Sequence, residues 1–432
     1  MHFGNILWNL VGLGLPLLIA ALTIPELITV IGSERFGLLA LAWGLIGYAG
    51  ALDLGIGRAT TQRVSAMRES AENQQIPHVL ATAIRITYIT GGIGMLVILI
   101  AAACRAYSYI QTNNVAVLEI QISMVLLALA LPMQAISATY RGVNEAYLNF
   151  KDISILRVFL GATNFGLPYL IASYTTKLYW LVATLVFSRC LALVFYRYFA
   201  HRCMNDAGHI VYGKYTKDIA RQLFQFGGWV TVSSIISPIL VQADRFFVGG
   251  LISASAITLY VIPYEVVTQA LIIVGAITTI AFPVITNLIH NAPQQATITF
   301  RLWLYRITGL MLIILSILAA VMPILLKLWV GQHISEESIW TGQILCIGVF
   351  FNSIGAMYYA LLHAQGQTQS TAILHLIEFP LYILLLIILI NTFGIVGCAI
   401  AWSIRTLFDT IGLILMSKLF ERKKRARQYA TV

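Results

Sequence analysis

The sequence predicts an all-α polytopic membrane protein, with twelve transmembrane helices in two parallel six-helix bundles around a central cavity. Hydrophobic residues make up 59% of the 432 residues and charged residues only 10%. The mean hydropathy is +0.84, far outside the range of soluble globular proteins. Apolar segments long enough to cross a bilayer recur along the whole chain and leave no room for a separate soluble domain.

Twelve such segments follow one another, and each is expected to form one helix. They cover roughly residues 8–31, 36–57, 79–103, 119–141, 153–174, 178–199, 228–252, 257–289, 301–330, 339–363, 371–391 and 396–419. The first six are expected to form an N-terminal bundle at residues 1–200, and the last six a C-terminal bundle at 223–419. A cytoplasmic linker at 201–222 joins the bundles, and a basic cytoplasmic tail at 420–432 follows.

An internal duplication is consistent with two bundles of six helices. A shift of 221 residues aligns Trp8 with Trp229, Arg85-Ile86-Thr87 with Arg306-Ile307-Thr308, Pro16 with a neighbour of Pro238, and Arg189 with the vicinity of Arg405. Because six spans return the chain to its starting side, the halves are expected to be parallel repeats with a substrate path at their interface. A coincidence in apolar sequence stays the alternative.

The basic residues lie mainly on one side of the predicted spans. Counted from a cytoplasmic N-terminus, eighteen lysines and arginines fall on the cytoplasmic side and four on the other, namely Arg35, Arg105, Lys177 and Lys327. This asymmetry predicts that both termini are cytoplasmic. The net charge of +10 therefore indicates membrane topology and contact with anionic lipids, not nucleic acid.

Neither a cofactor nor a metal is indicated by the sequence. The five cysteines, at positions 104, 190, 203, 346 and 398, have no metal-ligand spacing. His375 and Glu378 are three residues apart on one predicted helix, which suits a metal or proton site by spacing alone. Two ligands do not make a metal site, so a polar contact inside the bundle is the other interpretation.

Five arginines are candidates for binding substrate. Arg189, Arg245 and Arg405 lie deep in predicted spans, where each costs roughly 2.5–3.5 kcal/mol on insertion scales. They are expected to face a protein-lined interior and to bind an anion there. Arg85 and Arg306 lie only a turn or two inside their helices, and their duplication makes them candidates for the site at which substrate enters.

Carboxylates within the spans are candidates for cation coupling and gating. This group contains Glu26, Asp53 with the nearby Arg58, Asp244, Glu378 and Asp409. Because the side chains of Asp244 and Arg245 point about 100° apart on a helix, each needs a partner of its own. Arg405 and Asp409 are four residues apart, so an ion pair within the helix is one interpretation of them.

Two prolines interrupt the first span of each half. Pro16 and Pro238 lie at matching depth on helix faces that also carry polar residues. A hinged gate is the functional interpretation, and a simple kink that fits one helix to another is the alternative.

Residues 31–65, IGSERFGLLALAWGLIGYAGALDLGIGRATTQRVS, resemble the signature of Wzx-type polysaccharide flippases, a family of the multidrug/oligosaccharidyl-lipid/polysaccharide exporter superfamily. The sharp motif covers Phe36 to Arg63. It includes Gly37, Asp53, Gly55, Gly57 and Arg58, and Gly55 and Gly57 are expected to permit close approach of another backbone.

The resemblance implies a flippase of the bacterial inner membrane, and not an enzyme. Such a protein moves an undecaprenyl-pyrophosphate-linked O-antigen or similar repeat unit from the cytoplasmic to the periplasmic leaflet. The resemblance also implies a cationic cavity, alternating access and coupling to H⁺ or Na⁺. Expected partners are the lipid-linked oligosaccharide, the coupling cation, membrane lipids and other membrane proteins of polysaccharide assembly.

Three other functions compete with this one. A multidrug or cation antiporter of the same superfamily should have a cavity dominated by carboxylates. A membrane polysaccharide polymerase or ligase should hold its catalytic groups in a large external loop, whereas the longest one predicted here, about residues 104–118, carries only Arg105 as a charge. A structural scaffold would not need charges at bilayer depth.

Overall fold

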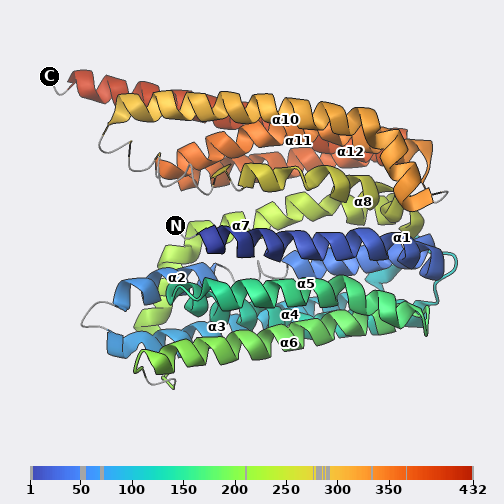
Figure 1. Ribbon diagram of the computed structural model, residues 1–432, viewed down its shortest axis with the longest axis horizontal. Helices are drawn as coiled ribbons and strands as arrows, with labels where there is room; N and C mark the ends of the chain where they lie inside the picture. Colours follow the sequence, from blue (N-terminus) through green and yellow to red (C-terminus); the bar gives the residue numbers. More distant parts are fainter. Residues whose placement is uncertain are drawn as a thin grey trace. The chain divides into compact units, whose positions relative to one another are not determined.

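The structure is a computed structural model that describes residues 3–48, 55–68, 73–209, 212–275, 277–278, 285, 288, 292–331, 334–365 and 367–430. Most of these residues are helical, and the described part of the chain contains no β-strand (Figure 1). The expected all-α membrane fold is therefore confirmed. The chain divides into two units, Met1–Pro238 and Ile239–Val432.

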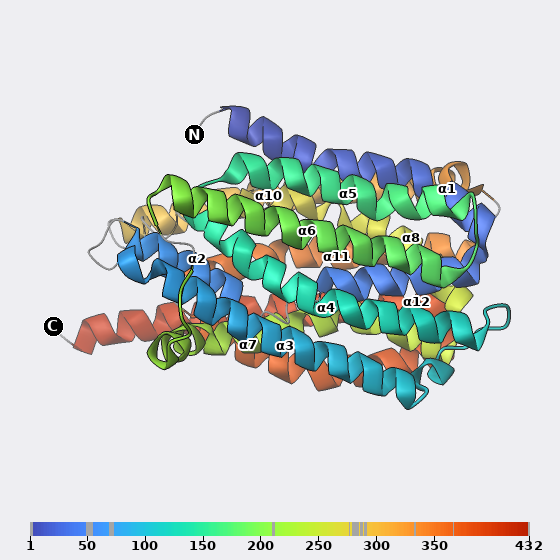
Figure 2. The same cartoon turned by 90° about the horizontal axis from the view of Figure 1, so that it is seen from below.

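The first unit contains α1 (Phe3–Tyr48), α2 (Ile56–Met67), η2 (Asn73–Gln75), α3 (Ile76–Ala103), η3 (Ala106–Tyr109), α4 (Val117–Ala146), α5 (Phe150–Ala172), α6 (Leu178–Asp206) and the first part of α7 (Lys217–Leu251). The second contains the end of α7, α8 (Ala254–Thr268), α10 (Pro293–Val330), α11 (Glu336–Ala364) and α12 (Thr368–Ala430). In the first unit α4 packs against α3 and α6, while α1 packs against α5 (Figure 2). In the second unit α11 packs against α12, α10 and α8.

Two glycines divide the longest helices and account for the number of spans. Gly32 in α1 has φ 79°, and Gly394 in α12 has φ 58°. Both values lie in the left-handed region that glycine adopts without a steric penalty. The helices α1 and α12 therefore each supply two spans. With α3–α6 in the first half, and α7, α8, α10 and α11 in the second, they account for the twelve predicted spans.

The helix bounds repeat at the spacing found in the sequence. A shift of 221 residues places Gly32 on residue 253 (32 + 221), the turn between α7 and α8. At that turn Ser253 accepts a hydrogen bond from the backbone N–H of Ala256 and caps α8. The same shift places the start of α4 at residue 338, two residues from the start of α11 at Glu336. At equivalent turns, the first half therefore has a glycine with positive φ and the second half has a helix cap.

The outer face of α3 is apolar and exposed. Tyr88, Ile89, Ile93, Val97 and Ile100 are each 54–65% exposed along this helix. A soluble protein rarely leaves so long an apolar face uncovered. Eight described helices are long and apolar enough to cross a membrane, so the face of α3 is suited to contact with acyl chains.

The segment between the halves is largely helical. α6 continues to Asp206 and α7 begins at Lys217, so both extend into the expected linker at 201–222. Between them, the backbone N–H of Lys214 donates to His78 Nδ1 at 2.9 Å, and that of Thr216 donates to Thr82 at 3.0 Å. The segment is therefore fastened to the start of α3. α12 likewise continues as a helix through the basic tail to Ala430.

Candidate functional site

The glycine-containing segment at residues 55–57 lies where α2 packs against α4. Gly55 precedes α2 with φ 71°, and its carbonyl accepts the first hydrogen bond of the helix, from Ala59. Thr61 donates to the carbonyl of Gly142 on α4 at 3.0 Å. A Cβ atom at Gly142 would lie 2.4 Å from the carbonyl oxygen of Gly57. The expected close backbone approach is therefore present at Gly57, where Gly142 of α4 leaves the space for it.

Replacement of Gly142 by alanine should separate these two helices. Because the colliding atom belongs to the backbone, a shift of the helices is required, and we expect a loss of about 1–3 kcal/mol of stability. Thermal unfolding of the purified protein in detergent would measure it. Gly92→Ala on α3 is the matched control, since a Cβ there meets nothing within 4 Å. Equal melting temperatures for the two variants would contradict the prediction.

The gating candidates of the N-terminal half have different surroundings. Asp53 lies outside the described residues, and Arg58 is exposed on α2. Glu26 is exposed on α1 and accepts a hydrogen bond from the hydroxyl of Tyr169 on α5. A gating role for these residues stays a prediction.

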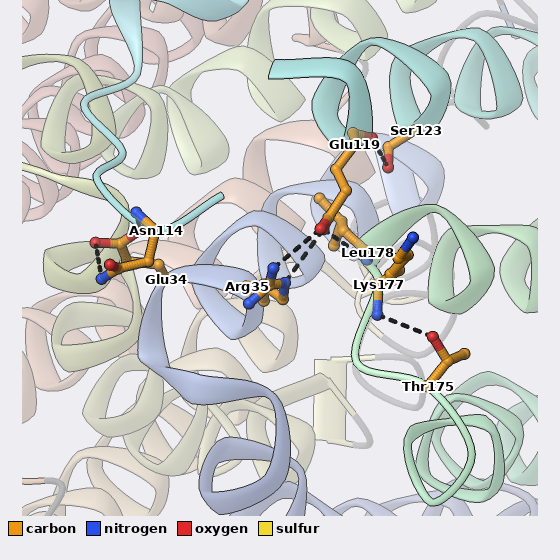
Figure 3. A network of polar contacts seen from close by, with 8 residues as sticks. All are labelled: Glu34, Arg35, Asn114, Glu119, Ser123, Thr175, Lys177 and Leu178. Carbon is orange, nitrogen blue, oxygen red and sulfur yellow. Dashed lines mark hydrogen bonds and ion pairs between the residues drawn. The ribbon is translucent and has the colours of Figure 1, made fainter. Parts of the chain in front are cut away.

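A polar cluster that the sequence did not reveal fastens three helices at the opposite end of the first unit from α2 (Figures 2 and 3). Arg35 on α1 donates two hydrogen bonds to Glu119 at the start of α4, at 2.9 and 3.1 Å. Glu119 also accepts from the backbone N–H of Leu178 at the start of α6, at 3.1 Å. Beside it, Glu34 accepts from the backbone N–H groups of Asn113 and Asn114. The only sequence signal was that Arg35 and Glu119 both lie at span ends.

Replacement of Glu119 by glutamine should loosen this cluster. The variant leaves Arg35, whose side chain is 22% exposed, without its carboxylate, so we expect a loss of about 2–3 kcal/mol, less than for a fully buried pair. The melting temperature in detergent is the measurement. Asp206→Asn, which removes the carboxylate of an exposed pair with Arg202 at 3.8 Å, serves as the control and should change little.

Pro16 of α1 fits against a glycine on α5. A Cβ atom at Gly161 would lie 2.3 Å from Cγ of Pro16, so the proline ring occupies the space that the glycine leaves. This contact agrees with the alternative of a kink that fits helix to helix. The side chain of Pro238 lies outside the described residues, and the hinged gate stays a prediction.

A cavity of about 330 Å³ lies within the first unit beside this contact. It is lined by pairs of polar residues seven positions apart on three helices: Gln134 and Arg141 on α4, Arg157 and Asn164 on α5, and Arg189 and Tyr196 on α6. Seven residues of α-helix rise about 10 Å. The polar groups therefore form two levels along the cavity.

Arg189 is the predicted site residue that this cavity contains. Its guanidinium donates to the amide oxygen of Asn164 at 2.9 Å and to that of Gln134 at 3.5 Å. Its Nε atom is buried and has no hydrogen-bond partner in the described part of the chain. Both partners are neutral, so within the described part of the chain the charge of Arg189 is solvated by amide dipoles and has no acidic partner.

Arg245 in the second unit has a contrasting environment. It is 4% exposed, pairs with Glu265 of α8 at 2.6 Å, and lies with its guanidinium 5.1 Å from the ring centre of Tyr264. The fully buried Asp244 accepts instead from the hydroxyl of Tyr260 at 2.6 Å. The expectation that Asp244 and Arg245 have separate partners is confirmed.

The two halves of α12 hold a second charged cluster. Side-chain ligand atoms of His375, Glu378 and Asp409 lie within 4.8 Å of one another. His375 Nε2 is 3.5 Å from Asp409, and Glu378 is 4.0 Å from Arg405 Nε. The guanidinium of Arg405 also lies 5.5 Å from the ring centre of Tyr382. Asp409 thus adds a third group to the pair recognised in the sequence.

This arrangement corrects one interpretation of the sequence. Arg405 and Asp409 do not form the ion pair that their spacing allows among the described contacts, because each faces the other half of α12 across the Gly394 turn. Both carboxylate oxygens of Glu378 are buried without a hydrogen-bond donor in the part of the chain described. Glu378 therefore lies close to Arg405 without a hydrogen bond between their side chains.

The duplicated arginines lie on exposed helix surfaces. Arg85 on α3 is exposed, and its guanidinium lies 5.1 Å from the ring centre of Tyr215. Arg306 on α10 is also exposed. Neither lines the cavity of the first unit, and their role at a substrate entrance stays a prediction.

Residues 3–289, more than half of the 432, match a family described as polysaccharide biosynthesis protein. The chain belongs to the polysaccharide biosynthesis protein family. This assignment agrees with the flippase resemblance of residues 31–65. A curated relative, the "Putative O-antigen transporter" of Shigella flexneri, is 29% identical over 408 residues, which are 94% of this chain and 95% of the relative.

Solved structures place this polysaccharide biosynthesis protein in a transporter fold. It is similar to a multidrug resistance MATE family transporter of the MOP superfamily in an inward-facing conformation, with a TM-score of 0.72, 14% identity, and 98% and 96% of the two chains covered. It is also similar to a MOP superfamily transporter from Pyrococcus furiosus, with a TM-score of 0.67 and 14% identity, and 96% of this chain and 93% of the other are covered. At such low identity these likenesses concern the fold alone.

Proposed function

We propose that this polysaccharide biosynthesis protein is a flippase for a lipid-linked oligosaccharide. Its substrate is an O-antigen or related repeat unit carried on a polyprenyl diphosphate such as undecaprenyl diphosphate. It moves this substrate from the cytoplasmic to the periplasmic leaflet of the bacterial inner membrane, with both termini in the cytoplasm. Transport proceeds by alternating access, and a gradient of H⁺ or Na⁺ supplies the energy. No covalent step is involved.

The observation that carries this proposal is the environment of Arg189. A buried guanidinium costs free energy in a membrane protein, and here its only described hydrogen-bond partners are two amide oxygens. An anionic ligand would supply the missing charge. A diphosphate suits it because guanidinium groups bind phosphate oxygens bidentately and stay charged at depth. The family assignment and the named relative support a saccharide substrate.

The charges of the second unit support cation coupling. Two arginines, Arg245 and Arg405, lie among four carboxylates, Asp244, Glu265, Glu378 and Asp409. The carboxylates outnumber the arginines, so protons or a metal cation can neutralise the excess. Asp244, Glu378 and Asp409 are the proposed coupling residues.

The rival function is a multidrug or cation antiporter. Its cavity should be acidic, whereas the cavity of the first unit is lined by Arg141, Arg157 and Arg189. Carboxylates in the second unit serve either function, because both kinds of transporter can be driven by a cation. The positive charge of the residues that line the cavity of the first unit is therefore the feature that favours the flippase.

Deletion in the native host followed by reconstitution would test the function. We expect lipid-linked repeat units to accumulate in the cytoplasmic leaflet of the deletion strain. The purified protein in vesicles should then expose a lipid-linked saccharide on the far leaflet when a proton or sodium gradient is imposed. Normal surface polysaccharide in the deletion strain, or efflux of cationic dyes without saccharide transfer in vesicles, would contradict the proposal.

A further inference from the structure

The three deep arginines divide into two kinds according to their partners. Arg245 and Arg405 each have a carboxylate within 4.0 Å in their own unit. Arg189 has none among the described contacts and donates only to Asn164 and Gln134. An arginine that already neutralises a carboxylate attracts an anion weakly. Of these three arginines, Arg189 is the one that has no carboxylate partner among the described residues and can therefore attract an anion more strongly.

The cavity around Arg189 continues to two further arginines. Arg141 lies seven residues from Gln134 on α4, and Arg157 lies seven residues from Asn164 on α5. Both line the cavity one level, or about 10 Å, from Arg189. Each is exposed, and Arg141 also lies 3.7 Å from Glu145, a partly exposed carboxylate. Three arginines thus line the cavity, and none of its described lining residues is acidic.

We propose that this cavity is a diphosphate site, in which Arg141 and Arg157 form the mouth and Arg189 with its two amides forms the inner end. Resting on the proposed flippase function, the site binds the diphosphate of the lipid-linked saccharide, and Arg245 and Arg405 do not contact it. A volume of about 330 Å³ is at the lower end of ligand pockets. It accommodates the charged group, not the whole oligosaccharide.

The order of the levels gives the site a direction. Arg141 and Arg157 belong to the basic side of the protein, which the charge asymmetry assigns to the cytoplasm. A diphosphate arriving from that side meets two exposed guanidinium groups first, where water still screens the charges. It then reaches Arg189, the single arginine of the inner level, whose attraction for the diphosphate is stronger because water is excluded there. Pro16 lines the same cavity, so a movement of α1 at this proline would reshape the site.

Binding of a short isoprenoid diphosphate to the full-length protein in non-ionic detergent tests the site. Radiolabelled farnesyl diphosphate is the probe, with inorganic diphosphate and phosphatidylglycerol as separate competitors. We expect Arg189→Gln to weaken binding about tenfold or more, as for the loss of a hydrogen bond to a charged group. Arg189→Lys should retain part of the affinity, and Arg141→Gln with Arg157→Gln should together lower it as well.

The matched control lies on the same helix. Arg202→Gln removes an exposed arginine of α6 that does not line the cavity, and binding should be unchanged. Arg405→Gln should also bind the probe normally. Wild-type binding by Arg189→Gln, or loss of binding in Arg405→Gln alone, overturns the proposal. So does displacement of the probe by phosphatidylglycerol as readily as by inorganic diphosphate, because the site would then accept any phospholipid headgroup.

Stability separates a binding role from a structural one. Arg189→Gln removes an unbalanced buried charge, so its melting temperature should equal or exceed that of the wild type. A marked fall in melting temperature together with the loss of binding would assign Arg189 to the structure and overturn the proposal.

Wild-type flipping in vesicles tests the parent function separately. Arg189-dependent diphosphate binding without flipping contradicts the function and leaves the site. Flipping by a protein whose Arg189→Gln variant binds the probe normally contradicts the site and leaves the function.

Discussion

Arg245→Gln is expected to destabilise the protein by about 3 kcal/mol. Breaking a buried ion pair by removing one partner costs roughly 3–5 kcal/mol. The lower end applies because the side chain of Glu265 is 43% exposed and can be rehydrated. The buried Asp244 also loses its neighbouring positive charge, although it keeps the hydrogen bond from Tyr260. Thermal unfolding in detergent measures the effect.

A double variant distinguishes this explanation from a packing defect. In Arg245→Gln/Glu265→Gln no unpaired charge remains at this pair, so most of the lost stability should return, and the double-mutant cycle gives the coupling between the two residues. Arg306→Gln, at an exposed arginine of the same unit, should leave stability unchanged. Additive losses in the double variant would contradict an ion pair as the source of the effect.

Glu378→Gln is expected to uncouple transport from the cation gradient. Glu378 is 6% exposed, and its carboxylate lies in the cluster with His375 and Asp409. Glutamine fills nearly the same space but cannot take up a charge or release a proton. Gradient-driven flipping should fall toward the rate measured without a gradient, by at least about fivefold, the lower limit of the factors by which coupled sites change each other's affinity. Flipping in vesicles with and without an imposed gradient is the measurement.

Two controls accompany this variant, namely a measurement of farnesyl diphosphate binding and a substitution of an exposed acid. Farnesyl diphosphate binding should stay at the wild-type level, because the proposed site lies in the other unit. Glu337→Gln removes an exposed acid from the first turn of α11 and should retain coupling. A Glu378→Gln protein that still responds to the gradient would remove this cluster from the coupling mechanism.

The two predictions follow from how each buried charge is balanced. In the second unit, arginines and carboxylates occur together and partly cancel, so loss of an arginine affects stability and loss of a carboxylate affects coupling. In the first unit, the cavity arginines exceed the acids, so loss of Arg189 affects binding. Sequence position alone treats Arg189, Arg245 and Arg405 as equivalent deep arginines. Their partners make them different.

Contacts between residues close together in the sequence were predictable, whereas contacts between residues far apart in the sequence were not. The adjacency of Asp244 and Arg245 excludes a pair between their side chains, and the structure agrees. Arg245 and Glu265 lie 20 residues apart on two helices, and Arg35 and Glu119 lie 84 apart. Pairs at these distances depend on how helices rotate and pack, and a local pattern does not encode that rotation.

The sequence by itself determined the membrane class and the twelve spans, because hydropathy and span length act locally and are read directly along the chain. The duplication stays a prediction from the sequence. The sequence also located the charges at bilayer depth. Only the tertiary structure decided which charges meet, that Asp409 faces His375 and not Arg405, and that Arg141 and Arg157 share a cavity with Arg189. The physical reason is that electrostatic balance depends on distances of a few ångströms between helices, which tertiary packing sets.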